Sequence, residues 1–255
     1  LGIPAEPLFR SSYFSNAVQL NGFLSMLYNA VDKSMTIKID SLVMRTINNM
    51  IAETIYDEYG TDALTSKSGV RAINLLYLYN QRFNTELTAE DAITTPDFIR
   101  FASLEMGVMA SRLTKISTLF NIGGKDRFTP SDMLHVVMLS DFRKSANVYL
   151  QSDVFHEQFT ALPNAEEVPF WQGSGTTYDF DDITAVKVTT ASNHSVTASG
   201  ILGIMFDRDA LGVTNLDRRV TTNYNPKAEF FNNWYKFDAG YFNDTNENFV
   251  VFFVA

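Results

Sequence analysis

The run MLHVVML, residues 133–139, marks the point at which the pattern of the sequence changes. An apolar run of this length is typical of a strand buried on both faces of a sheet. Before it, apolar residues recur at helical spacing in residues 14–31, 40–59 and 68–83, and Thr95-Pro96 begins a further helix. After it, strand patterns predominate. Helices first and strands later, without regular alternation of the two, predict an α+β fold rather than a doubly wound sheet.

The clearest helix lies over residues 40–59. Asp40 or Ser41 supplies an N-cap oxygen, and Gly60 ends the helix. A short β-prone piece, residues 35–39, precedes it. We expect one apolar stripe of the helix to face the sheet, and its residues are Leu42, Val43, Ile47, Ile51 and Ile55.

The remaining segments are expected to form two short helices and several strands. Ser68 is the expected N-cap of the helix over 68–83. The helices are expected over 141–150 and 153–159, and the strands over 183–190, 196–206, 219–224, 230–242 and 249–254.

Composition narrows the possible functions of the 255-residue chain. Its formal net charge of −9 argues against a groove that grips nucleic acid, because such a groove needs a basic footprint. The absence of cysteine excludes zinc ribbons, iron–sulfur sites, thiol catalysis and disulfide frameworks. Charged residues are only 19% of the chain and aromatic residues are 13%. Because aromatic side chains are enriched at interfaces, part of the apolar surface is expected to face other subunits.

No constellation of catalytic or metal-binding residues emerges from the spacing. His135, His156 and His194 lack the i, i+4 spacing of paired metal ligands. Ser174 has a glycine on each side, which differs from the G-x-S-x-G nucleophile elbow. Asp244 begins a run that resembles the first ligands of an EF-hand, but Phe249 replaces the required glycine. We therefore expect no catalytic, cofactor-binding or metal-binding residue.

Two charged groups have more than one interpretation. Asp207-Arg208-Asp209 ends the long apolar strand, and Arg218-Arg219 begins the next one. Either group can be ordinary surface charge, can bridge a strand end to a loop, or can pair across a subunit boundary.

Four strings of the C-terminal third form a recognisable series: GILGIMFDRDAL at 200–211, RVTTNYNP at 219–226, FFNNW at 230–234 and NFVVFF at 248–253. They resemble segments of tailed-bacteriophage major capsid proteins. The similarity continues upstream, in HVVMLSDF at 135–142, YLQSD at 149–153 and VPFW at 168–171, and it runs through most of the chain from about residue 13. Each string is weak by itself, and their order along the chain supports the resemblance.

The resemblance implies an HK97-like capsid fold with a spine helix and peripheral and axial domains. It implies that residues 1–60 belong to the peripheral domain, with the spine helix at 40–59. Residues 61–200 would form mainly the axial domain, and residues 201–255 would return to the peripheral domain with the terminal strand. The family's N-terminal arm and extended hairpin loop would be absent from this chain, and without that N-terminal portion we expect it to assemble poorly.

The function implied by the resemblance is that of a structural, non-enzymatic head protein without a cofactor. Such proteins self-assemble into hexamers and pentamers of an icosahedral or prolate shell around double-stranded DNA. Their partners are other copies, together with scaffolding, portal and decoration proteins, and no membrane is involved. Assembly would take place in the host bacterial cytoplasm, and the product would be the virion. Two alternatives stay open: an encapsulin-like nanocompartment subunit, and a hydrolase or carbohydrate-binding module with an aromatic-lined site.

Overall fold

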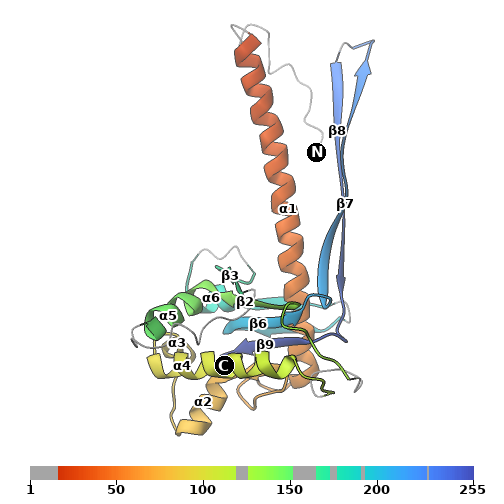
Figure 1. Cartoon of the computed structure of the whole chain (residues 1–255). Coiled ribbons are helices and arrows are strands. Elements are labelled where there is room, and N and C mark those ends of the chain that lie inside the picture. The colour runs from red at the N-terminus through yellow and green to blue at the C-terminus, as the bar shows by residue number, and fades with distance from the viewer. Residues whose placement is uncertain (1–16, 119–125, 152–164, 173–176, 191–192, 229) are drawn as a thin grey trace. The chain divides into compact units, whose positions relative to one another are not determined.

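The computed structural model describes residues 17–118, 126–151, 165–172, 177–190, 193–228 and 230–255 (Figure 1). The chain forms two compact units. Of the described residues, the smaller unit contains 17–42 and 217–238, and the larger contains the remainder.

Helix α1, Ala17–Tyr59, is continuous through the region expected to be interrupted. The predicted strand-like piece at 35–39 is therefore wrong, and so is the separation of a helix at 14–31 from one at 40–59. No proline or glycine occurs between Phe23 and Tyr59 to end the helix. Thr36 donates its hydroxyl to the Asp32 carbonyl at 3.0 Å, so this β-branched residue is accommodated within a helical turn. The low helix propensity of a β-branched residue costs little free energy, and this cost is smaller than the gain from continuing the helix through Thr36.

The larger unit is built on a five-stranded sheet in the order β1-β9-β6-β2-β3. These strands are β1 (Ala72–Asn74), β9 (Phe249–Phe253), β6 (Ile201–Asp207), β2 (Leu134–Leu139) and β3 (Ala165–Val168). The outer pairs β1–β9 and β2–β3 are parallel, whereas β9–β6 and β6–β2 are antiparallel. The sheet is therefore mixed, and it agrees with the expected α+β class.

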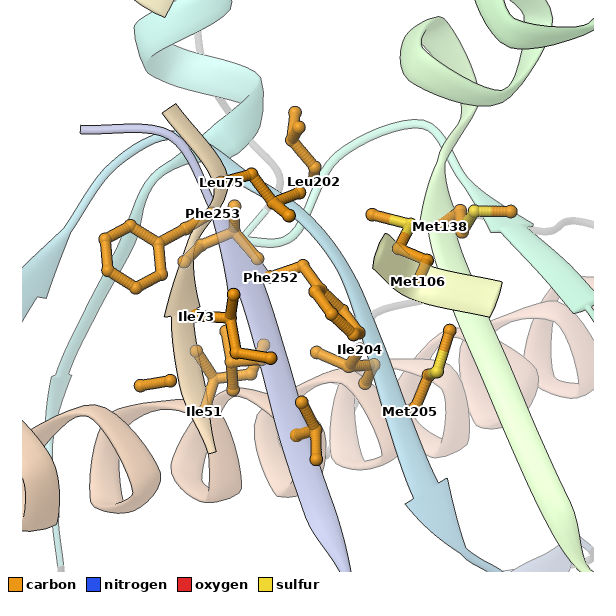
Figure 2. Packing of buried hydrophobic residues seen from close by; sticks show 14 of the residues in the cluster. Ile51, Ile73, Leu75, Met106, Met138, Leu202, Ile204, Met205, Phe252 and Phe253 are labelled. Carbon is orange, nitrogen blue, oxygen red and sulfur yellow. The ribbon is translucent and has the colours of Figure 1, made fainter. Parts of the chain in front are cut away.

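Both faces of the sheet are covered. Every residue of β6 and β9 is buried, which requires a layer on each side. On one side lies the C-terminal part of α1, where the Tyr59 ring meets the Phe253 ring edge-on with centroids 5.7 Å apart. On the other side lie helices α2 (Leu75–Phe83) and α4 (Pro96–Leu113), and Figure 2 shows Met106 of α4 with Met138 of β2.

The predicted stripe of α1 is confirmed within the larger unit. Ile47, Ile51 and Ile55 are buried, and Val43 packs against the core while partly exposed. Figure 2 shows Ile51 among the core side chains. Leu42, the remaining stripe residue, is half-buried.

The segment expected to be one helix over 68–83 contains a strand and a shorter helix. Residues 72–74 form β1, because they pair with β9 far along the sequence. Asn74 is the N-cap of α2, since its side chain accepts a hydrogen bond from Tyr77 N. Ser68 is not the cap; its hydroxyl accepts a hydrogen bond from Asn74 N at 3.1 Å. Tertiary pairing therefore outweighs local helical periodicity here.

The segment expected to be one strand over 196–206 is divided. It forms β5 (Ser195–Ala198) and β6, with Gly200 between them at a φ of 78°. A Cβ at Gly200 would lie 1.9 Å from the carbonyl oxygen of Val254, the residue after β9, so this close approach requires glycine. Strand β5 pairs instead with β4 (Val186–Thr189) in a separate two-stranded sheet.

The remaining elements of the larger unit largely follow the sequence. Helix α4 begins at Pro96 as predicted, and α5 (Ser140–Gln151) matches the helix expected over 141–150. Helices α3 (Ala89–Ala92) and α6 (Phe180–Thr184) are short. The strand predicted over 183–190 begins too early, because residues 183–184 belong to α6 and the observed strand is β4, Val186–Thr189. The helix expected over 153–159 lies outside the described residues.

Strands β7 (Leu211–Asn225) and β8 (Phe230–Asn243) form a long two-stranded hairpin. Both extend beyond the strands predicted over 219–224 and 230–242. Their outer portions, with α1 residues 17–42, make up the smaller unit. There the Tyr28 and Tyr235 rings are in tilted contact, with centroids 6.3 Å apart.

Candidate functional site

The histidines that the structure describes lie in structural contacts. His135 of β2 stacks on Phe206 with ring centroids 5.7 Å apart. His194 stacks on Tyr56 of α1 at 3.7 Å. Within the described ranges, no group of three or more His, Cys, Asp or Glu side chains is placed to hold a metal ion. His156 and Ser174 lie outside the described residues, so the expected lack of catalytic and metal-binding residues stays a prediction.

The run that begins at Asp244 forms a turn in which the Asp244 carboxylate is hydrogen-bonded by a residue of the same turn. Asp244 Oδ1 accepts hydrogen bonds from Asn246 N at 2.8 Å and Asn246 Nδ2 at 3.0 Å.

Asp207 of the first charged group is buried, and its Oδ1 accepts a hydrogen bond from Asp209 N at 3.0 Å. This hydrogen bond closes a local turn at the end of β6, and the three interpretations of the Asp207 group stay open.

An ion pair joins the Asp244 turn to the segment after α4. Arg127 donates Nη1 to Glu247 Oε1 at 2.5 Å. Burial raises the pKa of Glu247 above its ordinary 4.5, although Arg127 acts to lower it; Asp207 and Asp244 add to the increase. The pair is a partly buried brace in which desolvation of the carboxylate outweighs the attraction of its partner.

A cavity of about 600 Å³ borders α2 and the turn that follows it. Tyr77, Asn80 and Leu87 contribute to its lining. The Asn80 amide is occupied within the chain, because it donates to the Leu87 carbonyl and accepts from Leu87 N and the Thr85 hydroxyl. Among the described residues that line the cavity, no side chain carries a formal charge.

The most distinctive surface belongs to the smaller unit, where large apolar side chains face solvent. On α1 these include Met26, 58% exposed, and Ile37, 68% exposed. On the hairpin they include Val220, 56% exposed, and Trp234, 63% exposed. A soluble monomer rarely leaves so many large apolar residues uncovered in one small unit, whereas a subunit interface does.

The hairpin has two unlike faces. Tyr235 contacts α1 through Tyr28, and burial together with Tyr28 and Asp32 raises the pKa of its phenol. Since consecutive strand residues point to opposite faces, Trp234 and Lys236 lie on the face turned away from α1. That face also carries two ion pairs, Arg219 with Asp217 and Lys236 with Asp238.

Comparison with known proteins identifies the family. The family described as Phi29-like phage major capsid protein matches residues 11–253. The chain belongs to this family. As a Phi29-like major capsid protein it has a capsid shell role, which confirms the resemblance to tailed-phage capsid proteins and favours a non-enzymatic function. A comparison with curated proteins gave no match.

A solved capsid structure supports the fold of this Phi29-like protein. The capsid structure of Staphylococcus phage Andhra matches with a TM-score of 0.57 at 8% identity. The match covers 96% of this chain and 66% of that chain. At such low identity the likeness concerns the fold alone, and it agrees with the mixed helical and sheet architecture. No helix in the described parts of this Phi29-like chain combines the length and hydropathy required to cross a membrane.

The exposed surface of the Phi29-like chain was only partly predictable. The low charge and aromatic excess indicated an interface, but they did not locate it. Alternation of aromatic and charged residues along 235–238 was visible in the sequence. The sequence did not indicate which face of the hairpin α1 covers, because that depends on the contact between Tyr28 and Tyr235.

Proposed function

We propose that this chain self-assembles into the hexamers and pentamers of an icosahedral or prolate phage head that encloses double-stranded DNA. The observation that carries the proposal is the exposed apolar surface of the smaller unit, including Met26, Ile37, Val220 and Trp234. Contacts within one chain leave this surface in water, so its burial between copies would release favourable free energy at about 25 cal/mol per Å².

The charge of the chain is compatible with such a shell. A formal net charge of −9 disfavours tight adhesion to DNA, so the wall would enclose the genome without binding its sequence. Other copies of the chain are its main partners, with scaffolding, portal and decoration proteins as additional partners. Assembly takes place in the host bacterial cytoplasm, and the assembled protein resides in the virion.

The fold proposed for this function is HK97-like. Its peripheral domain comprises residues 1–60 and 201–255, and its axial domain is mainly 61–200. Helix α1 includes the proposed spine at 40–59, and the buried Ile47, Ile51 and Ile55 are what a supporting helix requires.

The test is the size distribution of the full gene product that contains this chain. Sedimentation velocity and negative-stain images are recorded over a range of protein concentrations. Uniform closed shells or discrete capsomers are expected. A protein that stays monomeric at all concentrations, with and without co-expressed phage head proteins, would contradict the proposal.

A further inference from the structure

The uncovered face of the hairpin has a charge pattern that its own fold does not explain. Thr222 donates its hydroxyl to Asn233 Oδ1 at 2.8 Å, so the two residues are cross-strand neighbours on one face. Since β7 ends at Asn225 and β8 begins at Phe230, we infer the register in which Thr222 is directly opposite Asn233. In an antiparallel pair, Arg219 is then opposite Lys236, and Asp217 is opposite Asp238. Like charges therefore face each other across the strands at two successive positions, an arrangement that costs stability in an isolated hairpin.

The ion pairs on this face run along the strands rather than between them. Arg219 Nε lies 3.3 Å from Asp217 Oδ2, and Lys236 Nζ lies 2.9 Å from Asp238 Oδ2. The four side chains are between 38% and 57% exposed. The face thus presents a basic row and an acidic row side by side, roughly 7 Å apart along the strands.

Such a pair of rows is complementary to itself. A two-fold axis that passes between the rows would place the basic row of one copy on the acidic row of the other. Each of the four charges would then gain a second partner of opposite sign across the self-complementary interface. Stacking two copies in the same orientation would instead place like charges together. Trp234, 63% exposed on the same face, adds the large aromatic surface typical of interface anchors.

We propose that the hairpin face formed by Asp217, Arg219, Lys236 and Asp238 docks on the same face of a second copy around a two-fold axis. This contact specifies one partner surface for the self-assembly proposed above, on which it rests. It also selects, for Arg219, the interpretation in which an arginine pairs across a subunit boundary.

Charge exchange between two variants tests the contact in the full gene product that contains this chain. An acidic variant carries Arg219→Asp with Lys236→Asp, and a basic variant carries Asp217→Lys with Asp238→Lys. Each variant alone would repel its own copies, and we expect its association to weaken by about tenfold or more. An equimolar mixture would restore association, because each acidic face then meets a basic one. The matched control is Lys227→Asp at the exposed hairpin turn, which should assemble like the wild type.

The readout is sedimentation velocity at low salt, followed by a salt titration of the wild type. Weakening of wild-type association by about tenfold in high salt would support the contact without any substitution. Variants that associate like the wild type, or variants that both fail without rescue on mixing, would overturn the contact while leaving shell formation in place. A wild type that never associates would overturn the shell proposal as well.

Discussion

The carboxylate of Glu58 joins α1 to the edge of the sheet, and its removal is a sharp test of how the larger unit is held together. Glu58 Oε1 accepts a hydrogen bond from Arg71 N at 2.7 Å, and Oε2 accepts one from Ala72 N at 3.0 Å. Ala72 is fully buried, and the Glu58 side chain is only 15% exposed. Both donors are therefore poorly placed to find water if the acceptor is lost.

Glu58→Gln retains the shape of the side chain but replaces one acceptor oxygen by an NH₂ group. One backbone N–H then faces a donor, and the remaining hydrogen bond loses its charge. A charge-assisted hydrogen bond contributes about 1.5–3 kcal/mol, and a buried unsatisfied donor costs about 1–3 kcal/mol. We expect the free energy of unfolding to fall by roughly 2–4 kcal/mol.

Asp57→Asn is the matched control. Asp57 lies next to Glu58 and contacts the same arginine, with Arg71 Nη2 at 3.4 Å, but its side chain is 34% exposed. A partly exposed pair of this kind contributes at most about 1 kcal/mol. The control isolates the effect of the two backbone hydrogen bonds from that of a lost negative charge.

Urea unfolding followed by tryptophan fluorescence provides the assay. The chain has two tryptophans, and in a Trp234→Phe background the buried Trp171 reports on the larger unit alone. Trp171 donates Nε1 to the Ile201 carbonyl at 2.8 Å, so its emission is sensitive to loss of the core. Equal midpoints for Glu58→Gln and Asp57→Asn would refute the assigned role of the carboxylate.

Two further predictions concern pH and backbone geometry. Because burial raises the folded-state pKa of Glu247 above 4.5, its ionised form penalises the folded chain at neutral pH, and the penalty disappears as pH falls through the raised pKa towards 4.5. The unfolding free energy of the wild type minus that of Glu247→Gln should therefore increase as pH is lowered over this interval. A difference that decreases would show that attraction by Arg127, and not burial, controls the pKa of Glu247. Gly200→Ala places a Cβ 1.9 Å from the Val254 carbonyl oxygen at a φ of 78°, so thermal melting should show a loss of about 2 kcal/mol or more. Gly107→Ala in α4, where a Cβ meets no atom within 4 Å, is the control and should be neutral or stabilising.

The parts of the fold that the sequence predicted are those in which local pattern and tertiary packing agree. Strands β2 and β9 are continuous apolar runs, and burial on both faces requires no other signal. The start of α4 at Thr95-Pro96 depends on local backbone chemistry alone. The buried stripe of α1 has ideal spacing, so its contact with the sheet was also predictable.

The missed parts depend on partners distant in the sequence. Residues 72–74 match a helix locally, and they form β1 only because β9 offers an unpaired edge. The division at Gly200 reflects a carbonyl group of Val254, which no nearby residue indicates. The candidate interface was missed for the same reason. Its charges are ordinary in sequence, and they become two rows only when β7 and β8 are placed side by side.

The position of β9 in the sheet also constrains the order in which the larger unit is completed. Residues 251–253 pair with residues 72–74 on one side, and β9 pairs with β6 on the other. Strand β1 is synthesised some 180 residues before its partner β9. Until β9 is in place, β1 therefore has no strand with which to pair. Pairings this distant form slowly, because the intervening chain must be ordered first. The hairpin of β7 and β8 is synthesised before β9, so a nascent chain has its proposed docking face before the larger unit can close. A chain in which β9 has completed the sheet would be ready to join a shell. A chain that presents the docking face before the sheet is complete would instead tend to aggregate.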